Sequence, residues 1–438
     1  MKRKTIVFSV DALVYEDIAY LRTKPNFSKL MVHCSGIERV CTVYPSITYP
    51  AHVSIMTGCR PGKHGVFTNY TVNDDWSGTW QYVGKGLVQT EDIFAAAKRA
   101  GCSTASVFWP VTGNNENIDW LIDEYFFPIP GETPEEGFGK LGANAETLAV
   151  VRDNMNRWPS EYHDRKGMLR KSHTFDDFIN GCVCRLIRSH RPDLLLAHNC
   201  MIDSLRHRYG VFNDYVRQGL DMIDEWLGEI MQAMDDAGVA EDTNFVILSD
   251  HGQMDFQRRL KINTLLRRGG FMSVDENEKL QDWQAFSQAN GMSATIFLKE
   301  PENAALYQRV FDYLCELRDS GEGGFGKIFT VDEVKERYGL YGNFSFIVES
   351  DGRTAFGDAY TEPLELPITL TDYRLGVATH GYMPEKGPQP VFLCNGPDFQ
   401  KDVLLPVGSV VDEAPTLAAI WGETMPDAEG KCLRELLA

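Results

Sequence analysis

Short apolar runs alternate with longer amphipathic stretches over the first 250 residues, a pattern typical of α/β domains. Four runs have the length and the β-branched or apolar character of strands: Thr5 to Val10, Ser103 to Trp109, Asp193 to His198 and Asn244 to Leu248. Continuous apolar runs of this kind indicate parallel strands that are buried on both faces. Between them, helical spacing predicts helices over 90–100, 175–189 and 211–237. We therefore expect an α/β fold with a mostly parallel central sheet flanked by helices.

Two segments depart from this alternation. The segment 114–160 is rich in Gly, Pro and acidic residues, which predicts irregular structure with short helices. Between about 255 and 375 the alternation weakens to mixed strands with one helix near 301–318, and core character returns at Leu375 to His380. We expect a core domain formed by 1–254 and 376–438 and a smaller inserted cap region over about 255–375, part of which could belong to the core.

Composition and charge narrow the class of protein. The net charge of −19 argues against stable binding to nucleic acid, which requires a basic surface. Lys2 to Lys4 precede an apolar run that Asp11 interrupts too early for a signal peptide, and no apolar stretch reaches transmembrane length. These features predict a cytoplasmic protein that does not bind membranes and whose ten cysteines are reduced. The oligomeric state stays open.

The segment from Tyr44 to His52 contains two prolines that restrict the backbone on either side of Thr48. Thr48 is expected in a constrained turn just ahead of a helix that Gly58 ends. The N-terminus of a helix favours negative charge, so a hydroxyl there can act as a nucleophile. The other interpretation is that Thr48 only caps the helix.

Acidic and imidazole side chains follow several of the apolar runs. Asp11 comes directly after the first run and Asp250-His251 directly after the fourth, while Asp203 and His207 are four residues apart after the third. The carboxyl ends of parallel strands share one edge of a sheet, where active sites form. Asp11 could instead cap the next helix, and Asp250-His251 could instead form an ordinary turn. His380 adds a further imidazole from a loop after residue 375.

Mixed carboxylate and imidazole ligands favour zinc, whereas ligand sets made only of oxygen would favour magnesium or calcium. Six such ligands divide into two sites of three residues each, which leaves coordination positions open for a nucleophile or a substrate. Two metals roughly 4 Å apart can clamp the attacking and leaving oxygens of a phosphoryl displacement. Asn69, in a loop rich in turn residues, could present its amide to an oxyanion or only satisfy its own turn.

The combined motifs resemble the alkaline phosphatase superfamily, and most nearly its nucleotide pyrophosphatase/phosphodiesterase (type I phosphodiesterase) branch. The resemblance lies in the order of these elements: Asp11, Pro45-Ser46-Ile47-Thr48-Tyr49-Pro50-Ala51-His52, Asp203-xxx-His207-xx-Gly210, Ser249-Asp250-His251-Gly252 and Thr379-His380-Gly381-Tyr382. It extends from residue 6 to about 397 and implies an alkaline-phosphatase-like fold.

The resemblance also implies roles for individual residues. Asp203, His207 and His380 would bind one zinc ion, and the other would be bound by Asp11, Thr48, Asp250 and His251. Thr48 would form a phospho-threonine intermediate that water then hydrolyses, and Asn69 would hold a phosphoryl oxygen. Tyr49 matches a position that stacks a nucleobase in relatives, although it could equally serve packing. The implied function is hydrolysis of phosphodiester or pyrophosphate bonds in a small-molecule or nucleotide substrate.

One departure and two alternatives accompany this interpretation. Arg206 stands where the familiar motif has glycine before the histidine, and it could project into solvent or contact a second phosphate. The same scaffold would also suit a phosphomonoester hydrolase or one resembling phosphonoacetate hydrolase. A catalytically silent binding protein is a further alternative, but it would be expected to have lost the nucleophile or a ligand. Sulfatases fit less well because Thr48 cannot become formylglycine.

Overall fold

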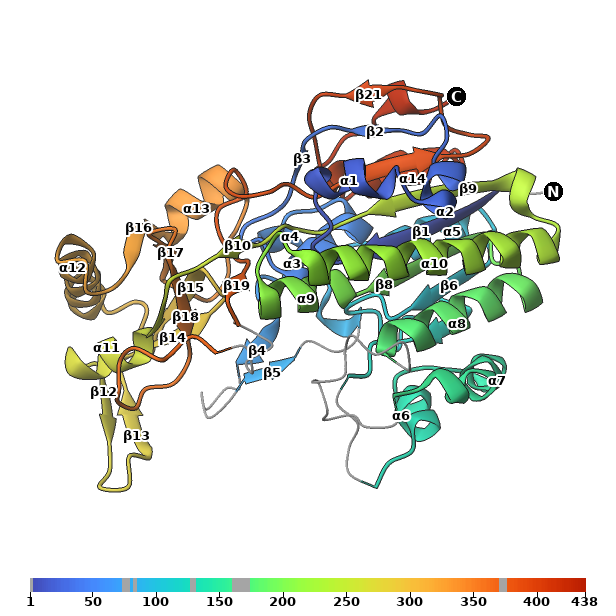
Figure 1. Ribbon diagram of the computed structural model, residues 1–438. Helices are drawn as coiled ribbons and strands as arrows, with labels where there is room; N and C mark the ends of the chain where they lie inside the picture. The colour runs from blue at the N-terminus through green and yellow to red at the C-terminus, as the bar shows by residue number, and fades with distance from the viewer. Residues whose placement is uncertain (1–2, 73–78, 82–84, 127–130, 160–173, 370–375) are drawn as a thin grey trace.

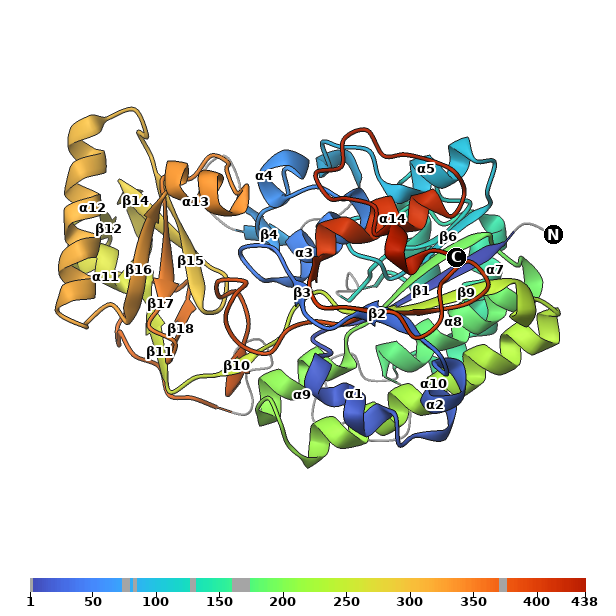
Figure 2. The ribbon, with the colours of Figure 1, turned by 90° about the horizontal axis from the view of Figure 1, so that it is seen from above.

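The computed structural model describes residues 3–72, 79–81, 85–126, 131–159, 174–369 and 376–438. Figures 1 and 2 show a larger body, which contains both termini, and a smaller body beside it. None of the helices within the described ranges has the length and apolar character needed to cross a membrane.

The larger body is built around an eight-stranded sheet. Its strands lie in the order β21 (Leu404–Leu405), β2 (Ser35–Ile37), β20 (Phe392–Asn395), β9 (Thr243–Leu248), β1 (Lys4–Val10), β8 (Leu194–Asn199), β6 (Thr104–Val107) and β7 (Trp120–Ile122). The five strands from β9 to β7 are parallel, and β20 pairs antiparallel to β9. Every residue of β1, β8 and β9 is buried, which explains why their sequences are apolar runs rather than alternating patterns.

Helices cover both faces of this sheet (Figure 2). One face carries α1 (Tyr15–Leu21), α2 (Pro25–Leu30), α8 (Phe175–Ser189), α9 (Met201–Tyr209) and α10 (Asp214–Ala237). The other face carries α3 (Thr48–Thr57), α4 (Pro61–His64), α5 (Ile93–Arg99) and α14 (Glu413–Ala419). The long helix α10 begins where the Asn213 side chain accepts from the amides of Tyr215 and Val216, and it ends at Gly238 with φ of 67°. The predicted α/β architecture is confirmed.

The smaller body has its own sheet and its own apolar core. The sheet is antiparallel, with the order β14 (Ala285–Ala289), β15 (Ser293–Leu298), β17 (Phe346–Ser350) and β16 (Phe325–Thr330). The helices of this body are α11 (Ile262–Arg268), α12 (Ala304–Asp319) and α13 (Val331–Tyr338). Further strand pairs are β11 (Arg258–Lys261) with β18 (Thr354–Gly357) and β12 (Met272–Val274) with β13 (Leu280–Trp283).

Short strands and helices complete the structure. The antiparallel pair β10 (Met254–Asp255) and β19 (Ala378–Thr379) lies where the chain leaves the larger body and where it returns. The other small elements are β3 (Val40–Cys41) paired with β22 (Gly408–Ser409), β4 (Tyr70–Val72) paired with β5 (Thr79–Gln81), α6 (Pro134–Lys140) and α7 (Ala145–Asp153).

Three details differ from the sequence predictions. Thr48 is the first residue of α3 rather than a residue ahead of the helix, because Ile47 is the extended residue at its N-terminus. The segment 114–160 contains strand β7 as well as short helices, because a three-residue edge strand carries too little sequence signal. The run Leu375 to His380 provides only the two-residue β19 outside the central sheet, and Leu375 lies outside the described residues.

Candidate active site

The three adjacent parallel strands β9, β1 and β8 bring acidic residues to one edge of the sheet. Asp11 directly follows β1, Asp250 and His251 come just after β9, and Asp203 lies in the first turn of α9, after β8. This is the carboxyl edge at which α/β sheets bind ligands.

Asp203, His207 and His380 form one group of metal-ligating type, because one ligand atom of each lies within 4.8 Å of the others. Asp203 Oδ1 is 3.3 Å from His207 Nε2 and 3.8 Å from His380 Nε2. His207 Nδ1 donates to the Ala378 carbonyl over 2.7 Å, since a carbonyl can only accept. This bond directs Nε2 of His207 toward Asp203, and Nε2 is the nitrogen that would bind a metal ion.

A second group surrounds the Nε2 atom of His251. Asp250 Oδ2 lies 3.1 Å from this atom, Thr48 Oγ1 3.3 Å and Asp11 Oδ1 3.6 Å. One ligand atom from each of Asp11, Asp203 and His251 also lies within 4.8 Å of the others. Asp203 therefore belongs to the first group and also lies beside the second. The structure thus brings together all seven residues that the sequence suggested as ligands.

Several buried polar atoms at this edge have no hydrogen-bond partner among the described residues, which indicates whether a cation fits there. Asp11 Oδ1, Asp250 Oδ2 and His380 Nδ1 are buried and form no hydrogen bond within the described part of the chain. Buried polar atoms without partners are costly, and a divalent cation would satisfy the carboxylate oxygens. With mixed carboxylate and imidazole donors, the residues present fit zinc.

The charges at the site also favour a cation. Burial and the nearby charges of Asp250 and Asp203 raise the pKa of Asp11 well above its ordinary value. Burial opposes ionisation of Asp203, but the neighbouring His207 lowers its pKa below the ordinary value. Burial lowers the pKa of His380 well below its ordinary value, so this imidazole is neutral and able to ligate. A divalent cation would offset the mutual repulsion of the three crowded carboxyl groups of Asp11, Asp203 and Asp250.

The loop that carries the nucleophile candidate is tied to the loop that carries His380. Gly381 N donates to the Ser46 carbonyl over 2.9 Å, and Ser46 Oγ donates to the Tyr382 carbonyl over 2.8 Å. From the smaller body, Met292 N donates to the His380 carbonyl over 2.8 Å. These bonds hold Thr48 and His380 in a fixed relation at the junction of the two bodies.

Asn69 and Tyr49 contact each other beside Thr48. Asn69 Oδ1 accepts from the Tyr49 amide over 2.9 Å, which leaves the Nδ2 group, a pure donor, for any anion. Tyr49 is only 4% exposed, and its hydroxyl bonds to Oε2 of Glu124. The oxyanion role of Asn69 and the stacking role of Tyr49 stay predictions.

Arg206 does not project into solvent, which is one of the two possibilities that the sequence leaves open. Its side chain is fully buried, pairs with Asp17 and donates to the Val211 carbonyl, with its guanidinium over the Phe212 ring. Its charge is therefore already paired with a buried carboxylate. The sequence could not reveal this because Asp17 lies 189 residues away.

Four polar residues that lie behind the predicted ligands were not predicted from the sequence. Gln253 donates to Asp203, and His52 Nδ1 lies 3.4 Å from Asp250 Oδ2. His198 lies between Asp11 and Glu124, and although burial opposes protonation, these two carboxylates raise its pKa well above the ordinary value. The available signal was a histidine next to the last residue of a fully buried strand, where apolar residues are usual.

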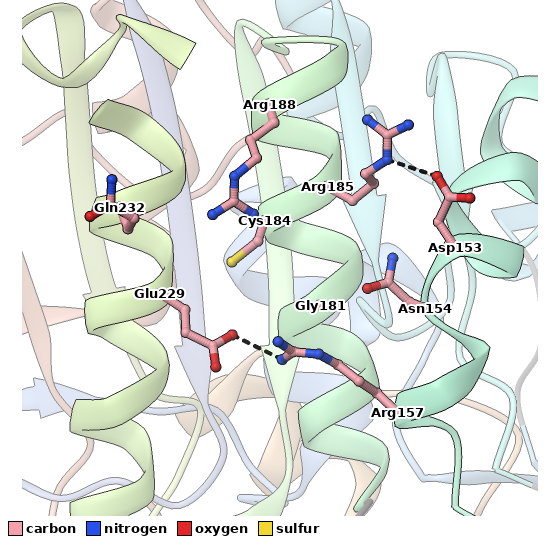
Figure 3. A pocket seen from close by; sticks show the side chains of 9 residues that line it. All are labelled: Asp153, Asn154, Arg157, Gly181, Cys184, Arg185, Arg188, Glu229 and Gln232. Carbon is pink, nitrogen blue, oxygen red and sulfur yellow. Dashed lines mark hydrogen bonds and ion pairs between the residues drawn. The ribbon is translucent and has the colours of Figure 1, made fainter. Parts of the chain in front are cut away.

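A separate cavity of about 270 Å³ lies beside α8 and α10 (Figure 3). None of its nine lining residues is a candidate site residue. Its arginines already pair with carboxylates, namely Arg157 with Glu229, Arg185 with Asp153 and Arg188 with Asp236. This cavity is therefore not the site that the predicted ligands form.

Known proteins resemble this chain in both sequence and fold. The family model "Type I phosphodiesterase / nucleotide pyrophosphatase" matches residues 5–383. Human ectonucleotide pyrophosphatase/phosphodiesterase family member 1 is 24% identical over 257 residues, which cover 57% of this chain and 23% of that protein. The chain thus spans about a quarter of the length of this curated relative.

Solved structures confirm the alkaline-phosphatase-like fold. The human ectonucleotide pyrophosphatase/phosphodiesterase 5 (ENPP5) structure matches with a TM-score of 0.68 at 18% identity, covering 99% of this chain and 100% of that one. A murine ENPP5 structure, described as inactive and in complex with AMP, matches with a TM-score of 0.65 at 17% identity over 100% of both chains. With the family model matching most of its length, the chain belongs to the type I phosphodiesterase/nucleotide pyrophosphatase family.

Proposed function

We propose that this protein is a zinc-dependent phosphodiesterase or nucleotide pyrophosphatase that uses Thr48 as its nucleophile. The observation that carries the proposal is the convergence of Thr48, Asp11 and Asp250 on His251 Nε2, directly beside the group of Asp203, His207 and His380. Family membership supports phosphodiester hydrolysis as the reaction class.

The ligand sets suit two zinc ions. Asp203, His207 and His380 would hold one, and Asp11, Thr48, Asp250 and His251 the other. When bound, such ions polarise the phosphoryl oxygens and favour the alkoxide form of a coordinated hydroxyl.

The chain's own residues account for the remaining chemistry. Thr48 Oγ1, at the first position of α3, forms a bond to phosphorus as the bond to the leaving oxygen breaks. Water then cleaves the phospho-threonine, so that one water is consumed for each phosphodiester and Thr48 is regenerated. Asn69, oriented by its bond to the Tyr49 amide, donates through Nδ2 to a non-bridging phosphoryl oxygen.

A nucleotide or another small phosphodiester is the proposed substrate. Murine ENPP5, which shares the fold, has been solved in complex with AMP. Tyr49 lies next to the nucleophile, where an aromatic side chain can contact a base of any identity.

The test compares hydrolysis of thymidine 5′-p-nitrophenyl phosphate with that of p-nitrophenyl phosphate, with zinc quantified on the same sample. The proposal predicts about two zinc ions per chain and a clear preference for the diester. A monoester preference would favour a phosphomonoester hydrolase. Metal without either activity would favour a phosphonate hydrolase or a silent binding protein.

A further inference from the structure

A continuous row of buried polar groups runs from Tyr49 to Asp11. The Tyr49 hydroxyl bonds to Glu124 Oε2, Glu124 Oε1 lies 3.6 Å from His198 Nδ1, and His198 Nε2 lies 3.2 Å from Asp11 Oδ2. The side chains of Asp11, Glu124 and His198 are 3%, 7% and 1% exposed, so water does not compete for these contacts.

The contacts of His198 fix the orientation of the Asp11 carboxylate. His198 Nδ1 lies 3.2 Å from the Phe108 carbonyl, which only accepts, so Nδ1 carries a hydrogen. A proton must also lie between His198 Nε2 and Asp11 Oδ2, since two lone pairs would otherwise face each other. This bond holds Oδ2 on the far side and leaves Oδ1 on the side of His251, 3.6 Å from its Nε2.

Glu124 in turn holds His198 and Tyr49 together. It comes from the segment after β7, whereas His198 lies on β8 and Tyr49 on α3. One oxygen of its carboxylate faces the imidazole and the other accepts from the tyrosine hydroxyl. The residue that follows the nucleophile is thus connected to a candidate metal ligand through two intervening side chains.

We propose that His198 is a positioning residue for Asp11 and that Glu124 extends this contact to Tyr49. The inference rests on the proposed function, because it takes Asp11 as a metal ligand. Hydrogen-bond partners behind metal ligands typically contribute 10–100-fold to metal affinity or activity. His198 therefore sets the zinc affinity of the Asp11 site, and Glu124 fixes the Tyr49 ring for contact with the substrate.

The test measures zinc affinity at both sites by chelator competition in the full chain. His198→Leu removes the donor to Asp11 and should weaken one of the two sites about 10–100-fold while leaving the other unchanged. His198→Gln keeps an amide donor and should stay within a few-fold of the unmodified protein. Unchanged affinity in His198→Leu would overturn the positioning role, as would equal loss in the Leu and Gln variants.

His64 offers a matched control for the loss of a buried histidine. It is also fully buried, and it bonds to Ser54 Oγ and the Val66 amide, away from the predicted ligands. His64→Leu should lower the melting temperature yet leave both zinc affinities unchanged. If it weakens the same zinc site as His198→Leu, general loss of packing explains the effect and the inference is wrong.

Two further variants test the extension to Tyr49 and remain informative if His198→Leu does not fold. Glu124→Gln removes the charge beside His198 and should weaken the same zinc site by a few-fold. Tyr49→Phe removes only the hydroxyl and should raise KM for thymidine 5′-p-nitrophenyl phosphate several-fold, with both zinc ions retained. Normal zinc affinity and normal KM in these variants would overturn the role of Glu124.

The zinc measurement also separates the inference from the proposed function. If the unmodified protein binds no zinc, the proposed function fails and the inference fails with it. If the unmodified protein binds two zinc ions and hydrolyses diesters while His198→Leu keeps both affinities, only the inference fails.

Discussion

Arg206 stands where the family motif has glycine, and the structure predicts that it stabilises the fold through its pair with Asp17. The guanidinium is fully buried and pairs with Asp17, whose side chain is 5% exposed. Asp17 also accepts from Val14 N over 3.0 Å at the start of α1. Within the described part of the chain, Arg206→Met would leave the buried carboxylate of Asp17 with the Val14 amide as its remaining donor.

The size of the effect follows from the burial of the pair. Two unit charges about 4 Å apart at an effective dielectric of about 20 interact by about 4 kcal/mol. Breaking a buried pair by removing one partner typically costs about 3–5 kcal/mol, since the other charge stays desolvated. We expect Arg206→Met to lower the free energy of unfolding by about 3 kcal/mol or more. Because the guanidinium is paired with the buried Asp17, we expect kcat/KM of the zinc-loaded variant to change less than about threefold.

Urea denaturation followed by circular dichroism measures this loss, and diester kinetics measure activity on the same preparations. The double variant Arg206→Met with Asp17→Asn supplies the control. Asparagine keeps an acceptor for the Val14 amide but carries no charge, so most of the lost stability should return. Unchanged stability together with a KM at least tenfold higher would refute the reasoning. It would indicate that Arg206 contacts the substrate.

Three further predictions follow from single positions. Thr48→Ala should reduce turnover by several orders of magnitude while leaving the fold intact, and near-normal activity would exclude Thr48 as the nucleophile. Gly381→Ala should lower zinc content and stability, measured by metal analysis and thermal melting, because a Cβ there would lie 1.6 Å from the Asn290 carbonyl oxygen at φ of 89°. Burial raises the pKa of Asp123 from 3.8 to about 7, so the folded state binds the extra proton and its stability falls as pH rises from about 4 to 7. Asp123→Asn should remove this pH dependence of the free energy of unfolding, which amounts to up to about 4 kcal/mol between about pH 4 and 7. Urea denaturation across that range measures it, and an unchanged pH dependence would contradict the assignment to Asp123.

The sheet and its acidic edge were predictable from sequence because they depend on local patterns. β1, β8 and β9 are uninterrupted apolar runs, and the residues that follow them meet at one edge for purely geometric reasons. Asp11 and Asp250 are predictable from the amino-acid sequence for this reason.

The supporting residues were not predictable, because their roles arise from contacts between distant segments. Glu124 meets Tyr49 across 75 residues, and His198 meets Asp11 across 187. The burial of Arg206 likewise depends on the distant Asp17. A short stretch of sequence shows the charge of such a residue but not its distant partner. From sequence alone, such a residue is therefore expected to face solvent or substrate.

The stereochemical course at phosphorus tests the central claim, covalent catalysis by Thr48, most directly. A diester made chiral with sulfur at phosphorus would be hydrolysed in ¹⁸O-labelled water and the configuration of the product determined. Attack by Thr48 followed by attack of water comprises two in-line displacements, so the account predicts net retention. Net inversion would mean that water attacks phosphorus directly, and it would contradict the account.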